Sequence, residues 1–313
     1  MMSAAEPYFS IAMPAFDAEA TIASAIDSVF EQDFEDWELV VVDDGSTDGT
    51  ADLVRRYSAR DARVTLIQKA NAGCGAARDT AVRGSRGAYI VRLDTDDALL
   101  PGYLSSMHRF IDSRPGYDIY SCNGWHLYPD GSRRLARPDE RYTQEQSFTF
   151  ADMLCACHIF TIAVFTRDLF DRVGGIRPGV YCEDLDFWLR SFAYAGATHR
   201  YAPQPLALYT VSDTQMTADV VRVLESRIAI YQDLIDSGRL DRDQEDLVRA
   251  AIERTHSDIW IYQRRTAITR TATRLLGARA GRRVSDMLHA GSRVMRPLVA
   301  PVAARLQRGR RVR

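Results

Sequence analysis

The chain has 313 residues, of which 46% are hydrophobic, 26% charged and 10% aromatic. These values are those of a globular protein and exclude disorder, a collagen-like repeat or a disulfide scaffold as the main architecture. The formal net charge of −2 conceals an asymmetry, because residues 264–313 carry 14 arginines and one acid and the rest of the chain is acidic. Five cysteines, no charged-then-apolar leader over residues 1–9 and no apolar run of bilayer length predict a cytoplasmic protein.

Strands and helices are expected to alternate through the first third of the chain. Strands are predicted at 8–13, 38–42, 64–67 and 88–93, and helices at 18–30, 48–57 and 75–83. The apolar run from Glu38 to Val42 is typical of a strand that is buried on both faces of a parallel sheet. Asp48 is expected to cap its helix, and Pro101 suits the first turn of a further helix. These repeated β-α-β units predict a Rossmann-like α/β fold with a doubly wound, mostly parallel sheet.

The alternation weakens beyond about residue 115. A strand is expected over 117–128, a turn over 129–131 and an apolar, β-branched segment over 159–165. A glycine-rich loop over 173–176 precedes an amphipathic helix, and the chain from Asp219 on is predicted to form a helical C-terminal extension. The expected division is a main domain over 1–215 with halves 1–115 and 116–215, a helical extension over 216–263 and a basic amphipathic tail over 264–313.

Three loops follow the carboxyl ends of predicted parallel strands, where ligands of such sheets bind. They are residues 14–17, 43–46 and 94–97, and the second and third are rich in carboxylates. The run Asp94-Thr95-Asp96-Asp97 favours a hard divalent cation, Mn²⁺ or Mg²⁺, which takes one or two carboxylates together with substrate phosphates. The alternative is an acidic cap of the following helix.

The other two polar segments suggest nucleotide contacts. Asp43 and Asp44 end a valine-rich strand, where a carboxylate can accept hydrogen bonds from a base or a ribose; a tight turn with a helix cap is the alternative. In Asn71-Ala72-Gly73-Cys74-Gly75-Ala76-Ala77-Arg78, glycines at a helix start allow close approach to phosphate and Arg78 adds charge. By itself this segment is equally compatible with a plain turn.

Taken together, three stretches resemble the family 2 glycosyltransferases, which have an A-type glycosyltransferase fold. They are IAMPAFDAEATIASAIDSVFEQDFEDWELVVVDDGSTDGT, NAGCGAARDTAVRGSRGAYIVRLDTDDALLPGYL and VGGIRPGVYCEDLDFWLR. The resemblance covers residues 9–210, about two-thirds of the chain. It implies that 1–115 binds a nucleotide sugar and that 116–215 faces the acceptor.

The resemblance also implies roles for individual residues. Those expected to contact the nucleotide sugar are Pro14, Ala15, Phe16, Glu19, Asp43, Asp44, Lys69, Gly73, Arg78, Asp94 and Thr95. Asp94 and Asp96 match the family's D-x-D pair and are the expected metal ligands, Asp96 foremost. Glu183 and Asp184 match the E-D motif, in which the aspartate serves as catalytic base.

Two departures from the family pattern stand out. Phe16-Asp17 replaces the frequent Tyr-Asn, and Tyr209-Thr210-Val211-Ser212-Asp213 lacks the histidine of the family's Y-R-V-H segment, leaving Asp213 as a candidate substitute. The Q-x-x-R-W signature of processive synthases is also missing. The resemblance thus implies an inverting, metal-dependent and non-processive enzyme. It would transfer a sugar from a nucleotide sugar, with a UDP-sugar as the favoured donor, to a hydroxyl of a glycan or lipid-linked acceptor. The expected setting is bacterial polysaccharide or glycoconjugate assembly.

Two other functions are compatible with a nucleotide-binding α/β sheet. A sugar nucleotidyltransferase should carry a glycine-rich basic loop after the first strand, which Met13-Pro14-Ala15-Phe16-Asp17 is not. A non-catalytic nucleotide-sugar-binding protein would not need the E-D pair.

The arginine-rich tail has three readings: a segment lying on an anionic membrane surface, a solvated segment, or a self-association element. Because many family members use lipid-linked acceptors, the resemblance adds a peripheral location at the inner membrane face. Nucleic-acid binding is disfavoured, since the acidic body would oppose it.

Overall fold

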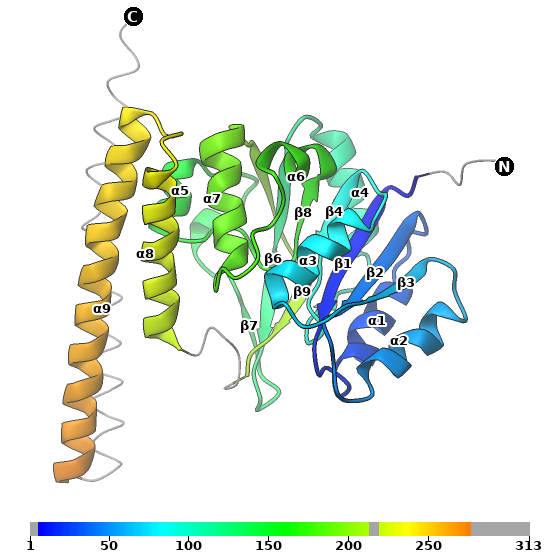
Figure 1. Cartoon of the computed structure of the whole chain (residues 1–313), viewed down its shortest axis with the longest axis horizontal. Helices are drawn as coiled ribbons and strands as arrows, with labels where there is room; N and C mark the ends of the chain where they lie inside the picture. The colour runs from blue at the N-terminus through cyan, green and yellow to red at the C-terminus, as the bar shows by residue number, and fades with distance from the viewer. Residues whose placement is uncertain (1–5, 213–218, 277–313) are drawn as a thin grey trace, which may run out of the picture.

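The computed structural model describes residues 6–212 and 219–276, which form one mixed sheet covered by helices (Figure 1). The nine strands run in the order β3-β2-β1-β4-β8-β6-β9-β5, with β7 paired to β6. They are β1 (Phe9–Ala15), β2 (Trp37–Asp43), β3 (Val64–Gln68), β4 (Tyr89–Arg92), β5 (Ala98–Leu99), β6 (Ile119–Leu127), β7 (Arg133–Leu135), β8 (Ala163–Thr166) and β9 (His199–Thr210). The helices are α1 (Ile22–Phe30), α2 (Thr50–Ser58), α3 (Cys74–Arg83), α4 (Tyr103–Ser113), α5 (Phe150–Cys155), α6 (Arg167–Val173), α7 (Glu183–Ala195), α8 (Val220–Asp236) and α9 (Arg242–Leu276), with a 3-10 turn at Glu140–Tyr142.

The first four strands of the order, β3-β2-β1-β4, are parallel, and the two central ones, β1 and β2, are buried on both faces. Alternate residues of β1 point to opposite sides: Ile11 and Met13 pack toward α1, α2 and α4, whereas Ala12 packs toward α3 and α7. This two-sided burial explains why the strands read as continuous apolar runs rather than as alternating patterns. The prediction of an α/β fold with a helical C-terminal region is confirmed.

Beyond β4 the sheet becomes mixed. Strand β8 is antiparallel to β4 and β6, and β6 is parallel to β9. The β6–β9 register shifts on either side of Asn123, and a Cβ added at Gly124 would lie 2.3 Å from the Phe160 ring, so this bend requires glycine. The sequence pattern does not reveal β9, because Pro203 and Pro205 interrupt it.

Three predicted helix starts are wrong by a short distance. Helix α1, expected from residue 18, begins at Ile22 after Thr21. Helix α2 begins at Thr50 after Gly49, although the Asp48 carboxylate still accepts a hydrogen bond from the Thr50 N–H at 3.0 Å. Helix α4 begins at Tyr103, and Pro101 lies in the preceding turn, because Gly102 takes a left-handed conformation with φ 78°.

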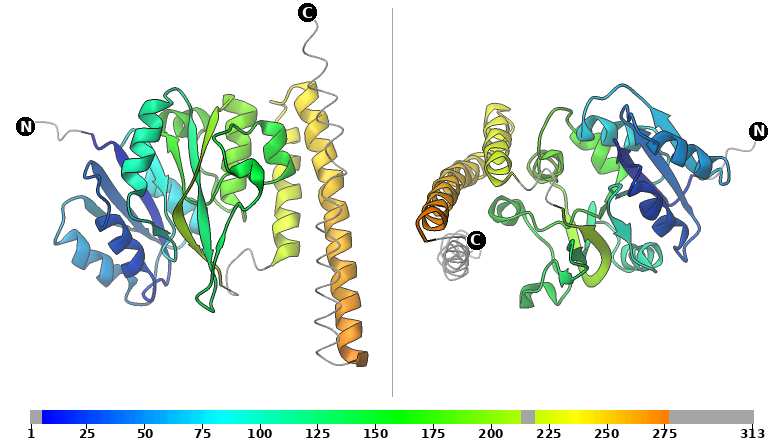
Figure 2. Two further views of the ribbon diagram at one scale, coloured as in Figure 1. Left: turned by 180° about the vertical axis from the view of Figure 1, so that it is seen from behind. Right: turned by 90° about the horizontal axis from the view of Figure 1, so that it is seen from below.

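Helices α8 and α9 stand side by side at one end of the molecule, next to α5 and α7 (Figure 2). Their apolar residues, Ile230, Tyr231, Leu234, Val248 and Ala251, join the core on the α7 side of the sheet. Helix α9 continues through residue 264, the expected start of the tail; the tail beyond residue 276 and Asp213 lie outside the described residues. Within the described part of the chain, no helix is both long and apolar enough to cross a membrane.

A buried aromatic stack joins the segment before β8 to β9. The imidazoles of His158 and His199 stack on the Phe148 ring with centroid distances of 4.4 and 5.2 Å. His199 Nδ1 accepts from the Phe148 N–H at 3.3 Å, and its Nε2 shares a hydrogen bond with Ser121 Oγ at 2.8 Å. Burial lowers the pKa of His158 to about 4 and that of His199 to about 3.

We therefore expect acid to destabilise the fold through these histidines. The unfolded chain takes up their protons near pH 6.5, whereas the folded chain does so only near pH 4 and below, so the free energy of unfolding should fall as the pH falls from 6.5 toward 4. His199 alone should contribute on the order of 2 kcal/mol of this loss between pH 7 and pH 5. Urea unfolding at pH 7, 6 and 5 measures the slope, and His199→Gln should flatten it. An unchanged slope in that variant would contradict the assignment.

Candidate active site

The carboxyl ends of β1, β2 and β4 form one edge of the sheet. Ala15 pairs with Asp43 across β1 and β2, and Ala12 pairs with Arg92 across β1 and β4. Asp43 ends β2, and the loop that starts at Asp94 follows β4. These two strands flank β1, so their axes are about 10 Å apart at the usual strand spacing. The three loops that the sequence singles out lie along this edge.

Hydrogen bonds join the loops after β1 and β2. The Asp17 N–H donates to Ser46 Oγ at 3.0 Å, and the Thr47 N–H donates to Asp17 Oδ1 at 2.7 Å. Glu19 accepts from the Gly49 N–H at 3.0 Å, so it supports the start of α2. Pro14 and Ala15 are buried, whereas Phe16 is 50% exposed and is the residue of this loop that offers an aromatic face to a ligand.

Asp43 and Asp44 are buried and bonded within the protein. Asp44 accepts from the N–H groups of Ala72 and Gly73, at 3.0 and 2.7 Å, and so holds the loop that leads into α3. Asp43 accepts from the Ser46 N–H at 3.0 Å and from Gln68 at 2.9 Å. Gly73 itself is exposed and adopts φ 90° just before α3.

Lys69 is bonded to β2 through its backbone, since its N–H donates to the Asp43 carbonyl at 3.0 Å. Its Nζ donates to Thr80 Oγ1 of α3 at 3.4 Å. Asp43, Asp44 and Lys69 thus all have partners within the protein. Their hydrogen bonds hold the loops at the carboxyl ends of the strands in place.

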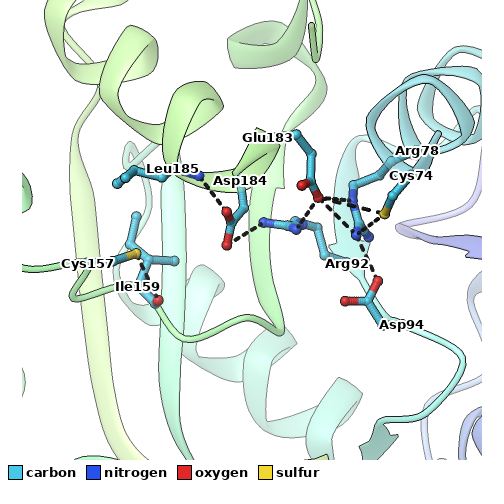
Figure 3. Close-up of polar contacts among 9 residues, drawn as sticks. All are labelled: Cys74, Arg78, Arg92, Asp94, Cys157, Ile159, Glu183, Asp184 and Leu185. Atoms are coloured by element: carbon cyan, nitrogen blue, oxygen red, sulfur yellow. Dashed lines mark hydrogen bonds and ion pairs between the residues drawn. The ribbon is translucent and has the colours of Figure 1, made fainter. Parts of the chain in front are cut away.

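Arg78 links the loop after β4 to the start of α7 (Figure 3). Its side chain is 2% exposed, and Nη2 donates to Asp94 Oδ1 at 2.8 Å and to Glu183 Oε1 at 3.2 Å. Helices α3 and α7 can approach because Gly75 has no side chain: a Cβ there would lie 3.0 Å from the Arg177 carbonyl oxygen and 3.2 Å from the Glu183 Cβ. Sequence segments more than 100 residues apart thereby meet in one polar cluster.

Arg92, at the end of β4, is a site residue that the sequence analysis missed. Its side chain is 3% exposed, with Nη2 3.4 Å from Glu183 Oε1 and Nη1 4.0 Å from Asp184 Oδ2. The signal was present, since a charged residue stands inside an otherwise apolar strand pattern that was expected to be buried. Its significance depends on which residues of the later helix face it.

Glu183 and Asp184 differ in exposure although they are neighbours. The Glu183 side chain is 10% exposed, and burial raises its pKa although Arg78 and Arg92 oppose the shift. Asp184 is 34% exposed, and its Oδ1 accepts from the Leu185 N–H at 2.7 Å. Of the two, Asp184 is the carboxylate that a substrate can reach.

The Asp94–Asp97 loop contains acids of opposite character. Although burial favours the neutral form, the charges of Arg78 and Arg92 lower the pKa of Asp94 and keep it ionised. Burial and the nearby Asp94 and Asp96 raise the pKa of Asp97 well above its usual value, and Asp97 Oδ1 accepts from the Thr210 N–H at 3.0 Å. Asp97 therefore ties this loop to β9, and its surroundings favour the protonated form.

The oxygen ligands that this loop offers fit a hard divalent cation. Asp94 and Asp96 offer carboxylate oxygens, and Asp94 is in the ionised form that a metal ligand requires. Within residues 6–212 and 219–276, no three His, Cys, Asp or Glu side chains are grouped so as to hold a metal ion. A cation here would take its remaining ligands from water and substrate phosphate, as Mg²⁺ and Mn²⁺ commonly do.

Comparison with known proteins gives this site a context. TuaG of Bacillus subtilis, whose name assigns it to teichuronic acid biosynthesis, is 27% identical over 232 residues, 73% of this chain and 89% of its own. S. aureus TarS in complex with UDP-GlcNAc superposes with a TM-score of 0.64 at 20% identity, covering 79% of this chain and 72% of TarS. The mannosyltransferase PcManGT of Pyrobaculum calidifontis, in complex with GDP-Man and Mn²⁺, gives a TM-score of 0.60 at 20% identity, with 91% and 84% coverage. The two structures show that the chain shares the A-type glycosyltransferase fold.

The family model for glycosyl transferase family 2 matches residues 10–174, more than half of the chain. That span contains the loops after β1, β2 and β4 and the arginine that links Asp94 to the start of α7. The protein therefore belongs to glycosyl transferase family 2 and is a glycosyltransferase.

Proposed function

We propose that the enzyme is inverting, metal-dependent and non-processive. It transfers a sugar from a nucleotide sugar, with a UDP-sugar as the favoured donor, to a hydroxyl group. The observation that carries the proposal is the cluster in which Arg78 holds Asp94 beside Glu183, with the exposed Asp184 next in sequence. This arrangement sets a carboxylate suited to hold a cation on the donor diphosphate near a carboxylate suited to remove a proton.

The proposed reaction is a single displacement. The acceptor oxygen forms a bond to the anomeric carbon while the bond between that carbon and the diphosphate oxygen breaks, and its electron pair stays on the diphosphate. Asp184 takes the proton of the acceptor hydroxyl during the attack. Attack from the face opposite the leaving group inverts the configuration of the anomeric carbon.

Asp96 and Asp94 would hold the cation, Mn²⁺ or Mg²⁺. When bound, the cation supplies Lewis-acid stabilisation of the charge on the departing diphosphate. The complex of PcManGT with GDP-Man and Mn²⁺ supports a divalent metal here, and that of TarS with UDP-GlcNAc supports a nucleotide-sugar donor. The remaining donor contacts fall to the edge formed by Pro14, Ala15, Phe16, Glu19, Asp43, Asp44, Lys69, Gly73 and Thr95.

The acceptor is proposed to be a glycan or a lipid-linked sugar in polysaccharide or glycoconjugate assembly. The relation to TuaG supports this substrate class. A basic tail over residues 264–313 would suit attachment at the inner face of an anionic membrane. Co-sedimentation with anionic vesicles, lost when the chain is cut after residue 264, is the corresponding measurement.

A donor screen tests the function directly. The protein with Mn²⁺ is mixed with UDP-glucose, UDP-galactose, UDP-N-acetylglucosamine or GDP-mannose, and both thermal unfolding and nucleoside diphosphate release are followed. A donor present at 100 times its Kd should stabilise the fold by about 2.7 kcal/mol, and chelation of the metal should remove most of that gain.

The same screen separates the alternative functions. A nucleotide-sugar-binding protein would show the thermal shift without release of nucleoside diphosphate from any acceptor mixture. A sugar nucleotidyltransferase would release pyrophosphate from a nucleoside triphosphate and a sugar phosphate. Either result would contradict the proposal.

A further inference from the structure

We propose that Arg92 is a positioning residue that holds the Asp184 carboxylate in the orientation needed to accept the proton of the acceptor. The inference rests on the proposed function, because it takes Asp184 as the base. Arg92, a residue of the central sheet, would thus contribute to catalysis indirectly, through the Asp184 side chain.

The first support is the position of the Arg92 guanidinium. The side chain is 3% exposed, and the guanidinium lies 5.7 Å from the centre of the Trp188 ring of α7. Figure 3 shows it between Glu183 and Asp184, the first two residues of that helix. Its Nη1 is 4.0 Å from Asp184 Oδ2, too far for a hydrogen bond and close enough for an ion pair.

The second support is an unused hydrogen-bonding capacity. Arg92 Nε and Nη1 are buried and have no hydrogen-bond partner within residues 6–212 and 219–276. A buried N–H without a partner costs free energy, so a carboxylate that reached Nη1 would gain a bond that this donor does not already make. A small rotation of Asp184 would bring its carboxylate within reach of Nη1, in keeping with catalytic hydrogen bonds that tighten only when substrate is bound.

The third support is that Glu183 has a second cationic partner in Arg78 besides Arg92. Glu183 Oε1 already accepts from Nε and Nη2 of Arg78, at 3.3 and 3.2 Å. Among the described ion pairs, Arg92 is the only cation within 4.0 Å of the Asp184 carboxylate. A purely structural role at the end of a buried strand would be served as well by an apolar side chain.

A double-mutant cycle tests the inference. Arg92→Met, Asp184→Asn and the double variant are compared with the unaltered enzyme in nucleoside diphosphate release with Mn²⁺ and the panel donor that turns over fastest, while donor affinity is measured separately. We expect Arg92→Met to lower kcat about 10²-fold, the cost of misplacing a catalytic group by about 1 Å, with donor affinity within about twofold. Because Arg92 acts through Asp184, the double variant should be no slower than Asp184→Asn alone.

A matched control is a second buried arginine, which belongs to α7 itself. Arg190 is 6% exposed and bonds Asp186 at 2.8 Å and the Val173 and Gly175 carbonyls, away from Asp184. Any rate loss in Arg190→Met should multiply with that of Asp184→Asn. Arg92→Lys serves if Arg92→Met does not fold. One ammonium keeps the charge without spanning both acids, so its kcat should be lower than that of the unaltered enzyme, and its combination with Asp184→Asn should be no slower than Asp184→Asn alone.

The outcomes separate this inference from the proposed function. If Asp184→Asn keeps full turnover, or no panel donor releases nucleoside diphosphate, the proposed function fails and the inference fails with it. If Asp184→Asn is slow but Arg92→Met is as fast as the unaltered enzyme, or the two losses multiply, only the role of Arg92 is wrong.

Discussion

Replacing Asp184 by asparagine is expected to lower turnover about 10²–10⁴-fold, the usual contribution of proton transfer by a positioned side chain. Asparagine has nearly the same shape but cannot take the acceptor's proton. The Asp184 side chain is 34% exposed, so the variant should fold and its stability should change little. Donor affinity should also stay close to that of the unaltered enzyme, because the donor contacts are proposed to lie along β1, β2 and β4.

The measurement is kcat for nucleoside diphosphate release, with donor Kd determined by calorimetry. Glu183→Gln is the informative comparison, because Glu183 carries the contacts to both arginines and its replacement should lower stability as well as rate. Full turnover in Asp184→Asn together with a rate loss confined to Glu183→Gln would move the role of base to Glu183.

Replacing Asp96 by alanine is expected to abolish the stimulation of donor binding by Mn²⁺. Asp94 and Asp96 are the two protein ligands proposed for the cation, so the loss of one removes a large share of the protein ligands that a cation would have. Without the cation, the departing diphosphate loses several kcal/mol of charge stabilisation, which corresponds to a rate loss of about 10²–10³-fold or more. Donor affinity with Mn²⁺ should fall to the value measured with chelator.

The comparison is a titration of UDP or GDP with and without Mn²⁺. Asp130→Ala is a suitable control, because Asp130 lies in the turn between β6 and β7 and bonds only the local Ser132 N–H among the described hydrogen bonds. Equal metal stimulation in Asp96→Ala and in the control would reject Asp96 as a ligand.

The first half of the fold could be predicted because each local signal there agrees with the global arrangement. The Glu38–Val42 run is apolar because β2 is covered on both faces, and turn residues mark its end. Strand β9 carries two prolines and β5 has only two residues, so both depend on pairing with strands distant in sequence. Such pairing leaves no periodic pattern for a sequence-based prediction to find.

The candidate active site, too, could be predicted from the sequence only in part. Motif position identifies Asp94 and Asp184 as residues of interest. It does not reveal that the Ala72 and Gly73 amides bond Asp44, or that burial and neighbouring acids raise the pKa of Asp97. Those properties follow from neighbours brought in by the fold. Arg92 shows the limit most clearly, because its partners lie about 90 residues further along the chain.

Arg78 has a consequence for how this chain can evolve. One guanidinium bonds acids from two distant segments, Asp94 and Glu183. Loss of Arg78 leaves both acids without this cation, and loss of either acid leaves a buried donor of Arg78 without its acceptor, so single changes should be selected against and surviving lineages should replace the three residues together. Covariation among the three positions across diverged descendants would be the genetic trace of that shared ion pair.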